Sequence, residues 1–308
     1  MRALPCAILV AVLAVAAAWG HPHAGGIAVR SGGTVFAGDI LRSRLLVIGP
    51  AGDWREILSV GHVRDLEMSA DETLYGVSQG SGLWMLGPGE RPAPVMAGFH
   101  GLFSIAPDGS FVLAPADSID RRPRLDLRSP SGRQSTLAVL NQIDALVCDG
   151  DNVVVADGSA VRRIAPDGTI RLLAGNAGKG LYGLTIGPNG PIVSLYQERA
   201  VIELPPDGSR RTLMTSEAPW APTDVHFSHG ALHVVEIAQH PCCWKGPRIR
   251  RVAQGSAPVT LVVFDDQDHF HLEPWDRPLE WLIVALVLAT VLIGALLRRW
   301  RARASRRL

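Results

Sequence analysis

The stretch NVVVADGSAVRRIAPDG, residues 152–168, decides the fold of this chain. It holds two runs rich in Val, Ile and Ala, separated by an Asp-Gly pair and followed by Pro-Asp-Gly. Short β-branched runs broken by Asp-Gly are typical of strands joined by tight turns. With its flanking runs, the stretch predicts four strands at Asp144–Cys148, Asn152–Asp157, Ala160–Pro166 and Thr169–Ala174.

The same pattern of four runs recurs along the chain. The turn glycines at 52, 89, 132, 168, 208 and 255 are 37, 43, 36, 40 and 47 residues apart. A repeat of about 40 residues with four strands, filled six times over residues 26–263, predicts an all-β fold, a six-bladed β-propeller of four-stranded blades. A β-sandwich would not need a fixed period, and an α-solenoid would need helical spacing of the apolar residues, which this segment lacks.

The repeats also carry a family resemblance. Residues 152–168 and GIAVRSGGTVFAGD at 26–39 resemble the NHL repeat, as do LYGLTIGPNGPIVSLY at 181–196 and PTDVHFSHGALHVVE at 222–236. The resemblance is weakest in the second and third units. It implies a six-bladed propeller of the NHL or SMP-30/gluconolactonase-like kind, a fold that hosts binders, hydrolases and lyases.

The resemblance to the lactonases does not extend to their metal site. In this chain, the positions that match that family's metal-binding slot hold Arg64, His100, Ile143, Tyr182 and Thr223. This set is poorly suited to a cation, so the resemblance does not imply lactonase activity.

The two ends of the chain predict export and a membrane tether. Residues 1–20 have a basic start, an apolar run and small residues before Gly20, which is typical of a cleaved signal peptide, with a retained anchor as the alternative. A linker at 264–278 leads to an apolar segment at 279–297, which predicts one transmembrane helix. Six Arg in the tail at 298–308 place the C-terminus in the cytoplasm and the propeller on the extracytoplasmic, periplasmic side of the cell membrane.

The charge of the chain argues against nucleic acid as a partner. Lys and Arg number 30 against 29 Asp and Glu, and the basic residues of the repeats are scattered without a stacking platform. We therefore expect an envelope protein or a small-molecule ligand as the partner.

The connectivity of the repeats separates a generic face from a variable one. In a four-stranded meander, the first-to-second and third-to-fourth turns share one end of the ring, and the remaining connections share the other. The second set is longer and chemically more varied, and binding residues concentrate in loops held by a rigid scaffold. The residues predicted to form a ligand-binding face there are His62, His100, Tyr182, Trp220, Asp224, Glu236, His240 and Trp244.

Three acids occupy equivalent positions on the innermost strands. Asp65, Asp144 and Asp224 are 79 and 80 residues apart, and carboxylates that converge on a central channel could bind Ca²⁺. The alternative is that each acid caps a local turn or lines a wet channel. No other cofactor is predicted.

These acids separate two hypotheses for the function. The first is a membrane-tethered binding or scaffold module that uses the variable face. The alternative is a metal-dependent hydrolase or lyase with a site at the channel mouth, in which His100 and His226 join the three acids.

The cysteines predict one unusual feature. Cys242 and Cys243 are adjacent in HPCCWKG, which we expect to be the longest loop of the variable face, and a vicinal disulfide would stiffen it. A metal-binding pair with His240 is the alternative. Cys148 is expected to be a buried, small apolar residue.

Overall fold

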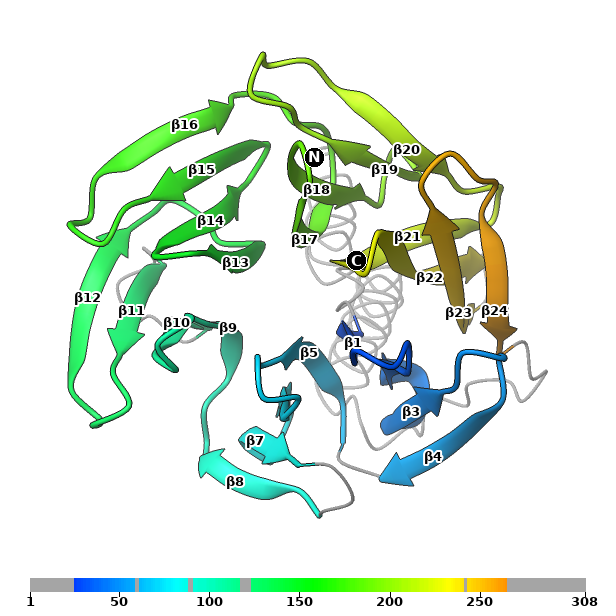
Figure 1. Ribbon diagram of the computed structural model, residues 1–308, viewed down its shortest axis with the longest axis horizontal. Coiled ribbons are helices and arrows are strands. Elements are labelled where there is room, and N and C mark those ends of the chain that lie inside the picture. The colour runs from blue at the N-terminus through cyan, green and yellow to red at the C-terminus, as the bar shows by residue number, and fades with distance from the viewer. Residues whose placement is uncertain (1–24, 59–60, 88–90, 117–122, 241–242, 265–308) are drawn as a thin grey trace, which may run out of the picture. The chain divides into compact units, whose positions relative to one another are not determined.

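Strands account for nearly all the regular structure among the residues that the structure describes. The computed structural model describes residues 25–58, 61–87, 91–116, 123–240 and 243–264, which form six antiparallel four-stranded sheets arranged in a ring (Figure 1). Each sheet takes its four strands in chain order. The predicted all-β, six-bladed propeller is confirmed.

The first three blades are built from β1 to β12. Blade 1 holds β1 (Ile27–Val29), β2 (Val35–Asp39), β3 (Arg44–Ile48) and β4 (Trp54–Leu58), with a 3₁₀ turn η1 (Ile40–Arg42) before β3. Blade 2 holds β5 (Val63–Met68), β6 (Leu74–Ser78), β7 (Gly82–Leu86) and β8 (Ala93–Met96). Blade 3 holds β9 (Gly101–Ile105), β10 (Phe111–Pro115), β11 (Arg124–Arg128) and β12 (Gln134–Val139).

The last three blades are built from β13 to β24. Blade 4 holds β13 (Ala145–Asp149), β14 (Asn152–Asp157), β15 (Ala160–Ile164) and β16 (Ile170–Ala174). Blade 5 holds β17 (Leu181–Gly187), β18 (Gly190–Leu195), β19 (Ala200–Glu203) and β20 (Arg211–Thr215). Blade 6 holds β21 (Trp220–Ser228), β22 (Ala231–His240), β23 (Cys243–Ala253) and β24 (Val259–Val263).

The ring is built from residues 25–264, and the two ends of the chain precede and follow it in the sequence. The chain divides into two compact units, Met1–Asp266 and Gln267–Leu308. The predicted signal peptide, the linker beyond residue 264, the transmembrane segment 279–297 and the tail lie outside the described residues. Within the part of the chain that the structure describes, no helix has the length and apolar character needed to cross a membrane.

The core is divided among the blade interfaces. The described residues form six clusters of buried apolar side chains, and each cluster joins two neighbouring blades. The second strands of the blades, such as β2, β14 and β18, are therefore buried on both faces, which explains why they read as apolar runs rather than alternating ones. In all six blades the outermost strand pair carries a register shift. Such bulges twist the edge strand and make it a poorer template for further pairing.

The ring closes between blade 1 and blade 6 without a shared strand. Both sheets are complete in themselves, so side chains and short polar contacts make the closure. The buried residues Ile27, Val29, Val235 and Ile249 belong to one cluster that spans this junction. Arg42 Nη1 also donates to the Gly246 carbonyl at 3.0 Å. We call the junction between blades 1 and 6 the seam.

The seam cluster generates a stability prediction. Ile249 is fully buried against blade 1, so Ile249→Ala should lower the free energy of unfolding by about 2–5 kcal/mol, through lost transfer energy and the cavity left behind. The matched change Ile170→Ala removes a side chain that is 41% exposed on β16 and should cost no more than about 0.5 kcal/mol. Urea unfolding followed by circular dichroism measures both. Equal losses would show that the seam packing does not limit stability.

Candidate functional site

A central cavity opens at the variable end of the ring. We call this end the loop face; it carries segments 40–43, 79–81, 97–100, 140–144, 158–159, 175–180, 196–199 and 216–219, and the opposite end is the turn face. The central cavity has a volume of about 440 Å³. Its walls come from the first residues of the innermost strands and from the connections around them, including Gly101, Ala116, Gln142 and Tyr182.

All three predicted acids line this cavity, together with Arg64. Each one, however, accepts a hydrogen bond from a backbone N–H. Asp65 Oδ2 accepts from Phe103 N at 3.1 Å, Asp144 Oδ2 from Gly158 N at 3.0 Å, and Asp224 Oδ2 from Ile27 N at 2.9 Å. The Asp144 bond stays within blade 4, whereas the bonds of Asp65 and Asp224 each reach the next blade of the ring.

The inter-blade bonds form a recurring device. Glu67 Oε2 accepts from Ile105 N at 3.0 Å, and Ser104 Oγ accepts from Cys148 N at 2.8 Å. Thr185 Oγ1 accepts from Phe227 N at 3.2 Å. In each case a side chain of one innermost strand accepts a hydrogen bond from a backbone N–H on the innermost strand of the following blade. The innermost strand has a pairing neighbour on one side only, so such an N–H needs a partner from elsewhere.

Burial of these acids shifts their pKa values upward. Removal from water raises the pKa of Asp65 to about 6 and that of Glu67 to about 8, against the lowering effect of the N–H donors. Burial, helped by the charge of Asp65, also raises the pKa of Asp224 well above its usual value. Asp65 and Asp224, which line the cavity, therefore keep a proton to a higher pH than a solvent-exposed Asp does.

The arrangement of these acids bears on the predicted Ca²⁺ site. Among the residues that the structure describes, no three His, Cys, Asp or Glu side chains come close enough together to hold a metal ion. Asp65, Asp144 and Asp224 thus share a cavity without forming a cluster. Asp144 accepts a hydrogen bond from the N–H of Gly158, in the turn between β14 and β15. This contact is the kind expected from the turn-cap alternative.

The mouth of the cavity carries the groups that remain polar and accessible. Gln142 Nε2 donates to Asp144 Oδ1 at 2.5 Å, and Tyr182 packs edge-on against Tyr196 with ring centroids 5.4 Å apart. Burial and the charge of Asp144 raise the pKa of the Tyr182 phenol. Sequence reasoning missed Gln142, although it stands two positions before Asp144 in the same connection.

Other predicted site residues lie outside the cavity wall. The backbone carbonyls of His62 and His100 accept hydrogen bonds from Gln79 N at 3.0 Å and Ala116 N at 2.8 Å. These two residues therefore fix the loop face locally, and neither side chain lines the cavity.

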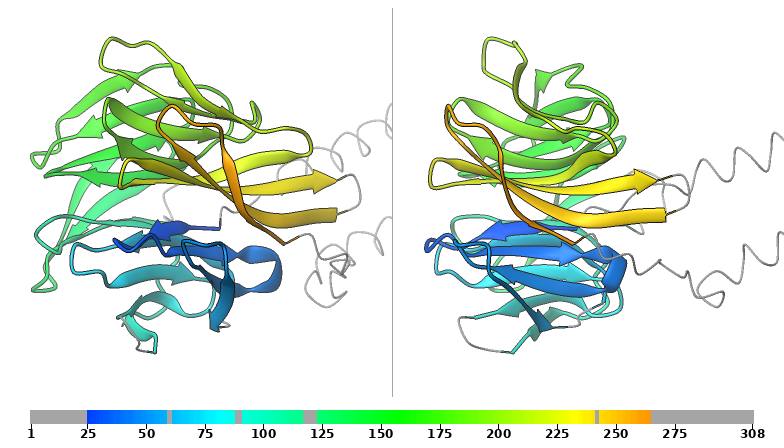
Figure 2. Two further views of the ribbon diagram at one scale, coloured as in Figure 1. Left: turned by 45° about the vertical axis from the view of Figure 1, so that its right-hand side comes forward. Right: turned by 90° about the vertical axis from the view of Figure 1, so that its right-hand side faces the viewer.

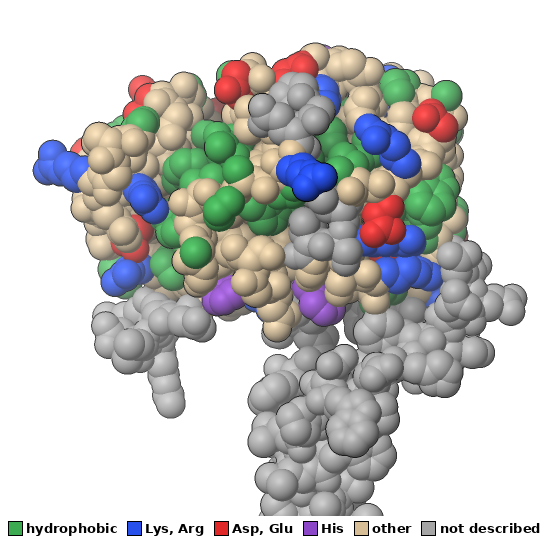
Figure 3. All heavy atoms as spheres, turned by 90° about the horizontal axis from the view of Figure 1, so that it is seen from below, with side chains coloured by type: hydrophobic (Ala, Val, Ile, Leu, Met, Phe, Trp, Pro, Cys, Tyr) green, Lys and Arg blue, Asp and Glu red, His purple; other side chains and the backbone are tan. Residues whose placement is uncertain are grey.

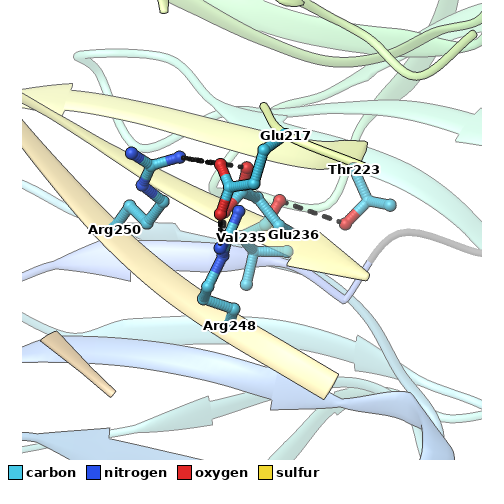
Figure 4. Close-up of polar contacts among 6 residues, drawn as sticks. All are labelled: Glu217, Thr223, Val235, Glu236, Arg248 and Arg250. Atoms are coloured by element: carbon cyan, nitrogen blue, oxygen red, sulfur yellow. Dashed lines mark hydrogen bonds and ion pairs between the residues drawn. The ribbon is translucent and has the colours of Figure 1, made fainter. Parts of the chain in front are cut away.

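Glu236 belongs to a separate charged cluster in blade 6 with Glu217, Arg248 and Arg250 (Figure 4), and Trp220 packs against its Arg248. Glu236 is fully buried, and its Oε2 accepts a hydrogen bond from Arg248 Nε at 2.6 Å. Arg248 also contacts Glu217 and lies over the ring of Trp220, 4.5 Å from its centroid. The Arg248 guanidinium lowers the pKa of Glu217. A buried carboxylate with this many charged partners is a structural anchor, since removing one partner leaves an unpaired buried charge.

This cluster holds the base of a long hairpin, which corrects one sequence prediction. Residues 240–246 were expected to form a loop, but β22 and β23 continue to pair as far as His240 and Cys243. Figure 2 shows this yellow hairpin extending beyond the neighbouring strands of the ring. Strand pairing is favoured over a loop here because it gives the backbone groups of this segment partners. Ala238 pairs with Lys245, Gln239 with Trp244, and His240 with Cys243. Cys242 and the side chains of His240, Cys243 and Trp244 lie outside what the structure describes, so the vicinal disulfide stays a prediction.

Two further nucleophilic side chains have structural roles. Cys148 is a free thiol, and burial raises its pKa to about 12. The segment Gly76-Val77-Ser78-Gln79-Gly80 fits the G-x-S-x-G pattern of hydrolases. Ser78, however, is fully buried at the end of β6, and its Oγ accepts from Trp84 Nε1 at 2.7 Å.

The rim of the ring is mixed in character. In Figure 3, viewed from the side of β4 and β8, acidic and basic side chains lie scattered among hydrophobic ones. Trp54 and Met85, on this part of the ring, are 47% and 38% exposed. Scattered apolar residues of this kind are normal on a protein surface.

Solved structures share this architecture. A gluconolactonase from Xanthomonas campestris matches with a TM-score of 0.57 at 15% identity, over 69% of this chain and 83% of its own. Virginiamycin B lyase from Staphylococcus aureus matches with a TM-score of 0.53 at 13% identity, over 78% and 85%. The chain has the fold of these propellers.

The similarity extends to a structure of a nidogen–laminin complex, with a TM-score of 0.52 at 14% identity over 60% of this chain and 77% of that one. No protein-family model and no curated protein matches the sequence. At these identities the propeller architecture is shared, and the activity of each neighbour remains its own.

The buried acids generate a prediction about pH. The folded-state pKa of Asp65, about 6, lies above its usual value of 3.8, so the folded state binds more protons than the unfolded state between these values. Wild-type stability should therefore fall as pH rises through this window. Asp65→Asn keeps an acceptor for Phe103 N–H and does not ionise. Relative to wild type, its free energy of unfolding should rise by about 2–3 kcal/mol between about pH 4 and pH 8.

Urea unfolding over this pH range measures the difference. The control is Asp151→Asn, in the exposed turn between β13 and β14, which should track the wild type at every pH. If Asp65→Asn also tracks the wild type, the Asp65 carboxyl is not the group that burial perturbs.

Proposed function

We propose that this protein is a binding module that receives a small polar ligand in the central cavity at its loop face. The observation that carries the proposal is the cavity itself, whose volume of about 440 Å³ falls in the range of about 300–1,000 Å³ typical of ligand pockets. It lies where the rigid inner strands present their first residues, so its walls are held in place by all the blades around it.

The lining favours a ligand with several hydrogen-bond donors. Apolar walls from Leu102, Ile143 and Leu184 face polar groups that are mainly acceptors, with Arg64 as the single lining cation. A hydroxyl-rich or amine-bearing molecule supplies donors to such acceptors and apolar surface to the walls. We assign the ligand contacts to the mouth residues Gln142, Asp144 and Tyr182, because Gln142 is exposed there and contacts Asp144, whereas Asp65 and Asp224 hold the next blade of the ring.

The alternative, a metal-dependent hydrolase or lyase, has weaker support. Gluconolactonases and a lyase share the fold, but the acids considered as metal ligands are used as acceptors for backbone N–H groups. A binding role requires only the cavity and its mouth, and one of the structural neighbours is part of a protein–protein complex.

The binding proposal is tested by closing the cavity. Ala116 is exposed and lines the mouth, so Ala116→Trp should abolish binding of cavity ligands without disturbing the core. Ala51→Trp makes the same change in an exposed turn of the opposite face and should bind like the wild type. Ligand-observed NMR with a set of small sugars, polyols and amines measures this. No binder in the set, or equal binding by both variants, would contradict the proposal.

We also propose that the module is exported and tethered to a membrane by residues 279–297. The support is the sequence alone: the apolar run and the six Arg that follow it. The full chain should sediment with membranes and expose the propeller to protease only from the extracytoplasmic side. A variant that ends at residue 266 should appear in the soluble extracytoplasmic fraction. Recovery of the full chain as a soluble protein would contradict the tether.

A further inference from the structure

A second pocket lies at the seam, on the turn face. It has a volume of about 270 Å³ and is lined from blade 1 by Val29, Ser31, Gly32, Gly33 and Pro50, and from blade 6 by Ser228, His229, Ala231, His233, Arg251 and Leu261. None of the candidate site residues predicted from the sequence lies in it. We call it the seam pocket.

Its basic side chains belong to blade 6. Blade 1 adds the hydroxyl of Ser31, which contacts the carboxylate of Glu72, itself paired with Arg30. His226, His233 and Arg251 are paired across three adjacent strands, so they form a row on one side of the sheet. Val235 and Ile249, two residues from His233 and Arg251 in their strands, pack against blade 1. Because side chains alternate along a strand, the row also faces blade 1.

Two polar atoms in this pocket are left without a partner. His233 is 5% exposed, and its Nδ1 is buried with no hydrogen bond to any residue that the structure describes. The same holds for Ser228 Oγ. Buried polar atoms are nearly always satisfied, so a group bound in this pocket would find two unpaired polar atoms to contact.

The charges of the pocket identify the kind of group. Arg251 makes no ion pair with a described residue, and no Asp or Glu is among the lining residues. An exposed guanidinium, two imidazoles and a hydroxyl are donors suited to an oxyanion. The other walls, Val29, Pro50 and Leu261, are apolar, and the volume exceeds what a bare oxyanion needs.

We propose that the seam pocket is a binding site for a small phosphate monoester, with its phosphoryl group held by Arg251, His229 and His233 and its apolar substituent against blade 1. The ligand bridges the two ends of the ring at the one interface that no chain connection spans. This site is independent of the central cavity and of the function proposed for it.

The imidazoles make binding depend on pH. Burial, together with Arg251 and His229, lowers the pKa of His233 to about 4; burial, with His233 and His229, lowers that of His226 to about 4. A bound dianion favours the charged imidazolium and raises both pKa values. By linkage, affinity for the anion should increase as pH falls from about 8 to about 5.

Titration calorimetry on the full chain tests the proposal with three probes. Phenyl phosphate represents the monoester, inorganic phosphate the headgroup alone, and sulfate, which stays a dianion throughout this pH range, isolates the titration of the protein. We expect saturable binding of all three, tightest for phenyl phosphate, and sulfate binding that strengthens as pH falls.

Variants assign the binding to the pocket. Arg251→Gln should weaken phenyl phosphate binding by roughly tenfold or more, as expected for loss of a charge-assisted hydrogen bond. His229→Asn, which suits the positive φ of 49° at this turn, should weaken it less, because it removes one imidazole donor and leaves Arg251 and His233 in place. The control Arg171→Gln removes an exposed Arg of β16 in blade 4 and should bind as the wild type does.

Thermal unfolding gives a second readout, since a ligand that binds only the folded ring raises Tm by mass action. Phenyl phosphate should raise the Tm of wild type and Arg171→Gln more than that of Arg251→Gln. The proposal is overturned if no probe binds saturably, or if Arg251→Gln binds phenyl phosphate as tightly as the control. Tighter binding of inorganic phosphate than of phenyl phosphate would overturn the assignment to a monoester.

Discussion

The hydrogen bond from Ile27 N to Asp224 Oδ2, 2.9 Å long, joins residues 197 positions apart, and the closed ring depends on it and on the packing around it. Five of the six blade interfaces lie between segments that are consecutive in the chain. The seam alone must gather the two ends of the propeller, and loop-closure entropy opposes it most strongly there. Without a shared strand, side chains have to supply this energy: the apolar cluster of Ile27, Val235 and Ile249, and the edge-on pair of Trp54 and Phe264 at 4.7 Å.

The same bond explains why acids stand on the innermost strands. Neighbouring innermost strands lie close to one another without pairing: a Cβ on Gly183 of β17 would lie 2.5 Å from Asp224 Oδ1 of β21. Short side-chain acceptors such as Asp224 and Thr185 can reach an N–H of the next blade across this narrow gap. The cost is desolvation of the carboxylates, which appears as the raised pKa values of Asp65 and Asp224.

The repeated strands and turns could be predicted from the sequence, whereas the contacts between residues that the closed ring brings together could not. Turn glycines at intervals of about 40 residues and runs of Val and Ile report local structure, so the blades and the loop face with its cavity followed from the pattern. Asp65 and Asp224 were placed on the inner strands correctly, but their bonds reach across blade interfaces, and no local pattern records such partners. The pairing of His240 with Cys243 was missed because Pro and two Cys in HPCCWKG suggest a loop, whereas backbone pairing extends the hairpin. The seam pocket combines residues near 30 and near 250, which only ring closure makes neighbours.

Asp224 has two roles: it lines the central cavity, and its hydrogen bond to Ile27 N joins blades 1 and 6 at the seam. A ligand in the proposed seam pocket would contact blades 1 and 6 at the turn face, and so would add to the contacts that close the ring. Such contacts matter most at the seam, because the other blade interfaces lie between consecutive segments of the chain, whereas this one has to bring the two ends of the propeller together.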